Sequence, residues 1–239
     1  MKRALVTGGN SPIGTAICRE LASMDFHVIV HGHHHQEMCD TVRNQLIEAG
    51  GSAESIWCDL TNREETERLM IALLESGPIQ VIVHNAGVFD DAPMAGMTSQ
   101  QWHQVIDVSL HGFFHVTQPL LLPMIRTRWG RIIPISSLSG MIGHRGQTNY
   151  SAAKSGLHGA ARSLATEIAS RGITVNVVAP GLIHSPSTEH AFTVEQIERM
   201  VPMKRAGQPE EVASVVGFLA SKKASYISGQ IIGVNGAMA

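Results

Sequence analysis

Short apolar runs alternate along this chain with segments in which apolar residues recur every three or four positions. The short runs predict buried strands, because a strand inside a parallel sheet is covered on both faces. The periodic segments, such as the one with Ile13, Ile17 and Leu21, predict helices that pack one stripe of side chains on that sheet. Strands are expected at residues 3–6, 27–31, 55–58, 79–84, 130–135, 173–179 and 231–234. This alternation predicts an α/β fold with a parallel sheet and helices on both faces.

The chain shows no internal boundary. No linker, charge block, low-complexity tract or repeat divides its 239 residues, and a single α/β domain often reaches this length. We therefore expect one domain over residues 1–239. The segment at about 182–207 has no clear period at its start and contains Ser, Pro and Thr, so it is predicted to form a substrate lid.

Composition narrows the class of protein. A hydrophobic content of 44% with 16% charged residues is typical of a globular protein with a sizeable core. The formal net charge of −2 leaves no basic footprint, which argues against a nucleic-acid partner. Three scattered cysteines, Cys18, Cys39 and Cys58, offer neither a disulfide framework nor a C-x-x-C motif. Because the chain shows no signal-peptide pattern and no long apolar run, we expect a cytoplasmic protein without membrane association.

A glycine-rich turn joins the first strand to the first helix. It reads Thr7-Gly8-Gly9-Asn10-Ser11-Pro12-Ile13-Gly14. Glycines let the backbone approach a pyrophosphate closely, and the first free N–H groups of a helix face the anion. The turn therefore predicts a phosphate cradle, although the turn by itself is also compatible with a purely structural role.

The end of the second strand bears on cofactor choice. Enzymes that select NAD usually place an acidic residue here, whereas this chain has Gly32-His33-His34-His35. No carboxylate stands here to repel a 2′-phosphate, so NADP is favoured, with histidine a weaker and pH-dependent anchor than arginine. Tandem histidines lack the spacing that converges on one ion, so no metal site is predicted.

Polar residues also follow the third and fourth strands. Asp59 comes after the third strand, and Asn85-Ala86-Gly87 follows the fourth. Ligands bind at the carboxyl ends of parallel strands, so these residues are candidates for a binding site. A helix cap is the alternative for Asp59, and a plain turn is the alternative for 85–87. Asn85 is also able to bond strand ends together.

The segment after the fifth strand holds candidate acid–base groups. Tyr150 and Lys154 stand four residues apart in a predicted helix and therefore on one face. An ammonium one turn away favours the phenolate and lowers the phenol pKa from its usual value of about 10, which predicts a proton donor. Ser137 would supply a hydroxyl to the same substrate oxygen. The pair alone is more typical of a solvated helix face, because neighbours at this spacing are common.

Six motifs occur in an order and at intervals that resemble the short-chain dehydrogenase/reductase family over the whole chain, and most of all its 3-oxoacyl-[acyl-carrier-protein] reductases. They are Thr7-Gly8 to Gly14, Asp59, Asn85-Ala86-Gly87, Ser137, Tyr150-x-x-x-Lys154 and Asn176-x-x-x-Pro180-Gly181. The resemblance implies one Rossmann-type reductase domain with a doubly wound, seven-stranded parallel sheet. It also implies a homotetramer built through the helices that contain Phe113 and Tyr150.

The resemblance further implies a mechanism. NADPH would give hydride to a ketone, Tyr150 would donate the proton, and Ser137 would hold the ketone oxygen. Lys154 would lower the pKa of the phenol and bond the nicotinamide ribose. The implied cofactor-binding residues are Gly8, Ser11, Ile13, Gly14, His33, Asp59, Leu60, Asn85, Ala86, Gly87, Tyr150, Lys154, Pro180, Gly181 and Ile183.

The chain departs from the family at a fourth catalytic position, where Ser109 replaces an asparagine that helps to hold a proton-relay water. A hydroxyl still bonds water but is shorter than an amide, so retained activity with a slower or altered relay is expected. Pro12 replaces a glycine and suits the first turn of a helix. Ser11 replaces a basic residue that is common in NADP-selective members.

Two arginines bear on the substrate. Arg128 and Arg171 match the family positions that dock an acidic acyl-carrier protein beside the mouth of the active site. The resemblance therefore implies reduction of a carrier-bound 3-oxoacyl thioester in fatty-acid or polyketide/aryl-polyene-type synthesis. One alternative is an NAD(P)-dependent dehydrogenase of a small secondary alcohol. Another is a non-catalytic nucleotide-binding subunit, which the presence of Ser137, Tyr150 and Lys154 disfavours.

Overall fold

A parallel sheet of six strands forms the centre of the molecule. The computed structural model describes residues 1–33 and 36–239, so the predictions for His34 and His35 lie outside the described residues. The strands follow the order β3-β2-β1-β4-β5-β6. Their bounds are Lys2–Thr7 (β1), Phe26–Gly32 (β2), Ser52–Trp57 (β3), Val81–His84 (β4), Gly130–Pro134 (β5) and Ile173–Val175 (β6).

The prediction of seven strands in one sheet is wrong. Beyond β6, the chain continues as β7 (Val177–Pro180), which pairs with β8 (Ile231–Val234) in a separate two-stranded parallel sheet. The break falls at Asn176, whose side chain donates to the carbonyl of Ile227 at 2.7 Å and accepts from the N–H of Gln230 at 3.1 Å. These bonds direct the second half of the predicted strand toward β8. An isolated bridge between Ile135 and Val178 still joins the two sheets.

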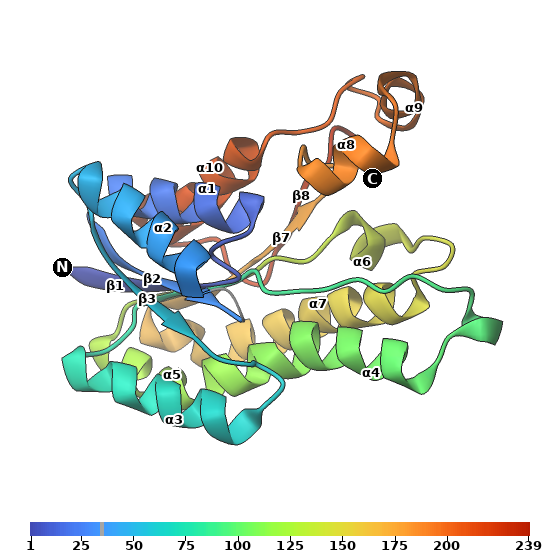
Figure 1. Ribbon diagram of the computed structural model, residues 1–239. Helices are drawn as coiled ribbons and strands as arrows, with labels where there is room; N and C mark the ends of the chain where they lie inside the picture. The colour runs from blue at the N-terminus through green and yellow to red at the C-terminus, as the bar shows by residue number, and fades with distance from the viewer. Residues whose placement is uncertain (34–35) are drawn as a thin grey trace.

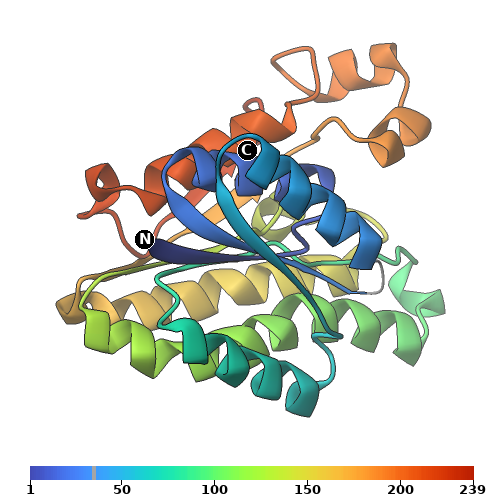
Figure 2. The ribbon, with the colours of Figure 1, turned by 60° about the vertical axis from the view of Figure 1, so that its left-hand side comes forward.

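Helices cover both faces of the sheet, as a doubly wound fold requires (Figures 1 and 2). One layer consists of α1 (Pro12–Ser23), α2 (Gln36–Glu48) and α10 (Pro209–Ala220). The other contains α3 (Arg63–Leu73), α5 (Gly112–Thr127) and α7 (Thr148–Ile168). Alternate residues of β2 point to opposite layers: Val28 and Val30 join one apolar core and Ile29 joins the other. This alternation explains the near-continuous apolar runs of the central strands.

The remaining helices are short. The helical stretch from Ser99 to Thr127 is divided into α4 (Ser99–Ile106), a π-helical turn η3 (Asp107–His111) and α5. Next to the site lie α6 (Leu138–Ile142), α8 (Pro186–Ala191) and α9 (Val194–Met200), the last two within the segment predicted to be a lid. In Figure 1, α8 and α9 project from the body at upper right. The 3-10 turns are η1 (Leu74–Ser76), η2 (Met94–Gly96), η4 (Ala169–Arg171) and η5 (Lys222–Ala224).

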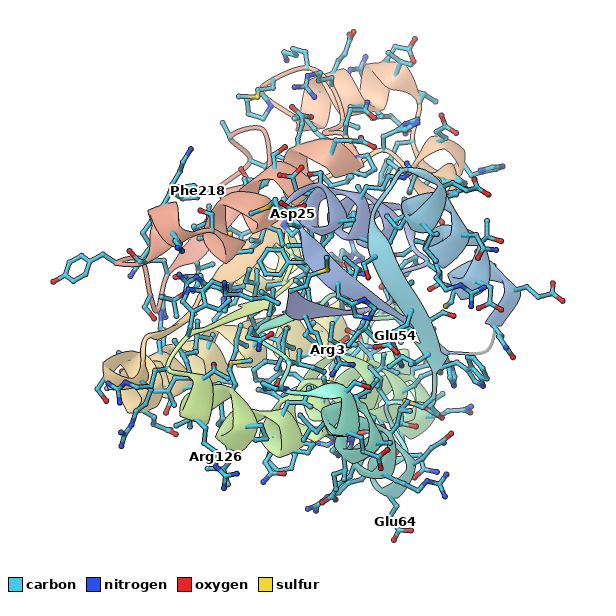
Figure 3. All side chains as sticks on the ribbon, turned by 90° about the vertical axis from the view of Figure 1, so that its left-hand side faces the viewer. Arg3, Asp25, Glu54, Glu64, Arg126 and Phe218 are labelled. Carbon is cyan, nitrogen blue, oxygen red and sulfur yellow. The ribbon has the colours of Figure 1, made fainter. Side chains whose placement is uncertain are left out.

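Arg3 ties strands together at the amino edge of the sheet. Its guanidinium donates to the carbonyls of Leu73 at 2.6 Å and Gly77 at 2.7 Å, and it pairs with the Glu54 carboxylate at 2.8 Å. Figure 3, which views this edge, shows Arg3 and Glu54 pointing toward one another. The candidate functional residues lie at the opposite, carboxyl edge.

Over residues 1–33 and 36–239, none of the helices has the length and apolar character needed to span a membrane.

Candidate active site

A cavity of about 360 Å³ lies at the carboxyl ends of β1, β2 and β4. Seven residues predicted to bind a cofactor line it: Gly8, Ser11, His33, Asp59, Leu60, Ala86 and Gly87. The structure therefore brings together residues from four separate motifs. Sequence reasoning missed other lining residues, notably His31 and Val108. His31 carries a readable signal because it is a polar residue within the apolar run of β2, whereas Val108 carries none.

The glycine turn has the geometry of a phosphate cradle. Gly8 adopts a left-handed conformation with φ of 61°, which favours glycine. A Cβ atom on Gly14 would overlap the carbonyl oxygen of Gly8, so the turn closes only with glycine at position 14. Ser11 caps α1 by accepting from the Gly14 N–H at 3.1 Å. The N–H of Gly14 is thus engaged, and the contribution of this glycine is close approach of the backbone.

Asn85 fixes the cradle against the neighbouring strand. Its side-chain amide donates to the carbonyl of Gly8 at 2.8 Å and to the hydroxyl of Ser11 at 3.1 Å. The hydroxyl of Thr7 accepts from the N–H groups of Asn85 at 3.1 Å and Ala86 at 3.0 Å. The prediction that Asn85 bonds strand ends together is confirmed. These residues fit a dinucleotide, because they hold an open backbone surface next to a helix N-terminus.

Asp59 and His33 face each other at one end of the cavity. The His33 imidazole Nε2 lies 3.5 Å from the Asp59 carboxylate. Asp59 also accepts from the backbone N–H and the hydroxyl of Thr61 at 2.9 and 2.8 Å. The helix-cap alternative for Asp59 is wrong, because Asn62 caps α3 by accepting from the N–H of Glu65. Asp59 therefore remains a candidate for cofactor binding.

Ser137 and Tyr150 meet beyond the end of β5. Ser137 is the N-cap of α6, and its hydroxyl accepts from the Ser139 N–H at 3.1 Å. Its hydroxyl also lies close to the phenol of Tyr150, which lies in the first turn of α7. Asn149, which sequence reasoning missed, accepts from the Tyr150 N–H at 2.8 Å and donates to the Asp90 carbonyl at 2.9 Å. It thus fixes the start of α7 against the loop that follows β4.

The predicted lowering of the Tyr150 pKa is wrong for the protein alone. Burial raises the pKa of the phenol, the neighbouring Ser137 hydroxyl lowers it, and the charge of Asp91 raises it further, so the net direction is upward. Lys154 is buried and donates to the carbonyl of Ile135 at 2.9 Å, with its Nζ atom 5.6 Å from the centroid of the Tyr150 ring. Burial lowers the pKa of Lys154 to about 8. The ammonium is therefore not bonded to the phenol, and burial of the phenol decides the direction of its pKa shift.

Ser109 lies beside Lys154. It is fully buried in the π-helical turn, and its hydroxyl has no hydrogen-bond partner among the residues that the structure describes. A Cβ atom built on Gly87 would lie 2.9 Å from the Lys154 Nζ and 3.3 Å from the Ser109 hydroxyl oxygen. Hence the Lys154 amine and the Ser109 hydroxyl both lie next to the backbone of Gly87. A buried hydroxyl without a partner costs stability. Its position beside an amine therefore marks Ser109 as a candidate functional residue.

Pro180, Gly181 and Ile183 form the base of the predicted lid. The N–H of Gly181 donates to the carbonyl of Val234 at 2.9 Å, and Ile183 pairs with Gly207 through an isolated bridge. The first contact joins the start of the segment to β8, and the second joins the two ends of the 182–207 segment to each other. Ile13, Asn85 and the three lid-base residues are near the cradle or the lid but do not line the 360 Å³ cavity.

Arg128 and Arg171 lie together, but not beside the active site of their own chain. Arg128 ends α5, and its guanidinium donates to the carbonyl of Ser170 at 3.3 Å. Arg171 follows the last turn of α7, whereas Tyr150 lies near its start. The 21 residues of α7 span about 30 Å. The predicted position beside the mouth is wrong within one chain, because Arg128 precedes β5 and therefore lies at the amino edge of the sheet.

Exposed apolar side chains occur on two segments near Tyr150. Phe89 and Met94 lie in the loop after β4, and Met141 and Ile142 lie in α6. The loop after β4 contacts the segment before α7 through the bond from the Ala92 N–H to the Gly146 carbonyl at 2.9 Å. Scattered exposed apolar residues are ordinary, but a group around a candidate site is typical of apolar ligand binding.

Comparisons with known proteins agree with this site. A family model described as enoyl-(acyl carrier protein) reductase matches residues 8–238. A 3-oxoacyl-[acyl-carrier-protein] reductase FabG of Aggregatibacter actinomycetemcomitans is 42% identical, over 98% of this chain and 98% of the relative. A 3-oxoacyl-[acyl-carrier-protein] reductase of Synechocystis is 40% identical, over 98% of this chain and 96% of the relative. A FabG of Staphylococcus aureus is also 40% identical, over 99% and 98%.

These matches cover nearly the whole chain, and they agree with a glycine cradle at the carboxyl edge of a parallel sheet. The chain belongs to the short-chain dehydrogenase/reductase family, whose members use a nicotinamide cofactor.

Proposed function

We propose that this protein reduces a 3-oxoacyl thioester, carried by an acyl-carrier protein, to the 3-hydroxyacyl form with NADPH. The observation that carries the proposal is the proximity of the Ser137 hydroxyl to the Tyr150 phenol, beside the buried amine of Lys154. The names of the relatives, which are 3-oxoacyl-[acyl-carrier-protein] reductases at 40–42% identity, support the same reaction. The reaction would serve fatty-acid synthesis or a related polyketide-type synthesis.

The residues of this chain would act on the ketone oxygen. A bound nicotinamide cofactor supplies the hydride that reduces the carbonyl carbon. Tyr150 and Ser137 would direct two O–H groups at the oxygen and stabilise the negative charge that develops there. Tyr150 would then give its proton to the alkoxide, and Lys154 would favour the phenolate that remains. The raised pKa of Tyr150 is consistent with this sequence of events, because the phenol stays protonated until the alkoxide forms.

The fit of a cofactor is supported by the cradle. Gly8 and Gly14 keep side-chain atoms away from the backbone that would face a pyrophosphate, and Asp59 and His33 line the far end of the same cavity. Gly32 leaves no carboxylate at the end of β2 to repel a 2′-phosphate. We therefore propose NADPH as the reductant, with His33 as the residue nearest to its 2′-phosphate.

The description of the matched family model raises a second candidate reaction, reduction of an enoyl thioester. In that reaction the final proton goes to carbon, whereas reduction of a ketone leaves it on oxygen. Two neighbouring hydroxyls, those of Ser137 and Tyr150, would both be able to donate to one oxygen. This favours the ketone. Oxidation of a small secondary alcohol would use the same groups but would not call for the apolar side chains of Phe89, Met94 and Met141.

Cofactor oxidation with carrier-bound substrates tests these alternatives. We expect NADPH consumption with a panel of 3-oxoacyl carriers, slower consumption with NADH, and none with matched enoyl carriers. Tyr150→Phe should lower kcat by about 10²-fold or more while NADPH binding is retained, because the ring keeps its packing and loses only the hydroxyl that donates the proton. Preference for an enoyl carrier or a free alcohol would reassign the reaction. Unchanged biological output from Tyr150→Phe would favour a non-catalytic subunit.

We further propose that Ser109 sustains the reaction in place of the usual asparagine, with a slower proton relay. Its buried hydroxyl is close enough to Lys154 to share a bound water with it. Wild type should turn over, and Ser109→Asn should change kcat without being required for it. If the wild type does not turn over and Ser109→Asn does, the native site lacks a working proton relay.

A homotetramer is also proposed, with contacts through α5 and α7. Two exposed apolar residues on α5, Phe114 and Leu122, support this because large apolar side chains on a free helix face favour association. Figure 3 shows another exposed aromatic residue, Phe218 on α10, at the surface. Light scattering of wild type and of Phe114→Ser/Leu122→Ser decides the matter, since a monomeric wild type would contradict it.

A further inference from the structure

His84, at the last position of β4, is a buried imidazole that connects two parts of the site. Its Nδ1 atom lies 3.2 Å from the hydroxyl of Thr7 on β1, and its Nε2 atom lies 3.0 Å from the carbonyl of Ser109 in the π-helical turn. The side chain is 0% exposed. The ring therefore spans from the central strands to the helical segment that carries Ser109.

The partners of the imidazole assign its protons. A carbonyl only accepts, so Nε2 carries a hydrogen and donates it to Ser109. The Thr7 hydroxyl already accepts from the N–H groups of Asn85 and Ala86, so it uses its own hydrogen to donate to Nδ1. All hydrogen-bonding capacity of Thr7 is then used. His84 is a neutral Nε2–H tautomer, and a proton added at Nδ1 would find no acceptor.

The surroundings maintain that neutral form. Burial, and after it the charge of Lys154, lower the pKa of His84 to about 3, and the hydrogen bond to the Ser109 carbonyl opposes them. A further small lowering comes from His31, the other ionisable group that acts on the ring. Phe113 packs its ring edge-on against the imidazole, with centroids 5.7 Å apart. His84 therefore keeps one orientation and one protonation state through the pH range in which an enzyme works.

The bond to Ser109 has a direct bearing on the site. The same residue gives its carbonyl to His84 and leaves its hydroxyl without a partner beside Lys154, within the part of the chain described. A π-helical turn is commonly found at functional sites because it shifts one residue out of the regular helical pattern. Anchoring the carbonyl fixes how that turn is oriented, and hence where the hydroxyl lies.

We propose that His84 is a positioning residue, which holds the π-helical turn so that the Ser109 hydroxyl stays next to the Lys154 amine. The inference rests on the proposed function, because it concerns the residues that would move protons in that reaction. His84 itself does not reach the substrate. Its role is to donate one hydrogen bond from a ring that Thr7 and Phe113 keep fixed.

Three variants test this role. His84→Phe keeps a flat ring but leaves the Ser109 carbonyl without its donor, and we expect kcat to fall about tenfold or more with KM values for NADPH and thioester nearly unchanged. His84→Gln places an amide N–H near the position of Nε2 and should recover most of that loss. His27→Phe is the matched control: it removes a β2 histidine that bonds Ser52 and Glu54, and it should affect stability but not kcat.

A double-mutant cycle separates positioning from general destabilisation. If His84 acts through Ser109, the losses in kcat from His84→Phe and Ser109→Ala overlap, and the double variant is no slower than the slower single variant. Losses that multiply would overturn the proposal. So would full activity in His84→Phe. If His84→Phe does not fold, His84→Leu, which also lacks the donor, completes the cycle with Ser109→Ala.

Nitrogen-15 NMR of the histidine rings gives a readout that does not depend on turnover. We expect His84 to show the neutral Nε2–H pattern at every pH from about 5 to about 9. Titration within that range, or an Nδ1–H pattern, would overturn the assigned placement. A wild type inactive toward 3-oxoacyl carriers would refute the proposed function, whereas the NMR result would still decide where the imidazole donates.

Discussion

At the scale of single residues, Lys154 shows a conflict between function and stability. Its amine is buried, and its pKa falls from 10.5 to about 8. In the unfolded chain the same amine stays protonated up to its ordinary pKa. Between about pH 8 and 10.5 the unfolded state therefore binds more protons than the folded state, so stability rises with pH across this window. Below about pH 8 the cost of burying the charge is present in full.

Lys154→Met makes this cost measurable. We expect the wild type to gain up to ~3 kcal/mol of unfolding free energy relative to Lys154→Met as the pH rises from 8 to 10. The variant also lacks the hydrogen bond to the Ile135 carbonyl. That loss is the same at every pH, so it does not contribute to the change with pH. Urea unfolding of both proteins at several pH values measures the difference. A difference that does not vary with pH would mean that burial leaves the pKa of the amine at its ordinary value.

His33 governs a second prediction at this scale, the choice between NADPH and NADH. His33→Asp would place a carboxylate where it repels a 2′-phosphate and accepts from a ribose diol, so the ratio of kcat/KM values should shift toward NADH by about tenfold or more. His33→Arg is the matched variant and should shift the ratio toward NADPH, because a guanidinium binds phosphate through a bidentate pair. If both variants leave the ratio unchanged, His33 does not face the 2′-phosphate.

At the scale of elements, the turn between β1 and α1 depends on a glycine at position 14. Gly14→Ala should weaken NADPH binding by about tenfold or more, because its Cβ atom would displace the Gly8 carbonyl from the cradle. Gly96→Ala is the control, since a Cβ atom there meets nothing within 4 Å. Fluorescence titration with NADPH compares them. Equal affinities in both variants would show that the phosphate binds elsewhere.

Some elements could be predicted from sequence and others could not. The predicted strands correspond to local apolar patterns, so β1, β2 and β8 appear close to their expected bounds. The break at Asn176 depends on partners about fifty residues away, and local patterns do not contain it. The Ser109 carbonyl in the π-helical turn is likewise bonded to His84, which lies on another element. The strand break and the π-helical turn thus involve long-range hydrogen bonds of side chains, which the apolar periodicity of the sequence does not contain.

The candidate site followed the same division. The positions of Ser137, Tyr150 and Lys154 could be inferred from their spacing and the order of the strands, and the structure brings them together. The direction of the Tyr150 pKa could not, because it depends on the extent of burial. The location of Arg128 was available in principle, since a residue just before a parallel strand lies at the amino edge of its sheet.

At the scale of the whole molecule, the two arginines and the phenol occupy opposite edges of one chain. Arg128 and Arg171 are exposed near the end of α7, about 30 Å from Tyr150 near its start. If the arginines dock an acidic carrier, the acyl chain that it presents would enter the active site of a neighbouring copy. The proposed oligomer would then be needed for activity on carrier-bound substrates, not only for stability.

Mixed oligomers test this arrangement. Tyr150→Phe chains retain the arginines, and Arg128→Glu/Arg171→Glu chains retain the phenol, so each homo-oligomer should be nearly inactive on a carrier-bound substrate. Co-expressed chains should regain activity at roughly one site in four, because half of the chains have the phenol and half of their neighbours have the arginines. A small 3-oxoacyl thioester without a carrier is the control, on which the arginine variant should keep full activity. Absence of recovery in verified mixed oligomers would mean that docking and chemistry take place within one chain, and full activity of the arginine variant on the carrier-bound substrate would remove these residues from docking altogether.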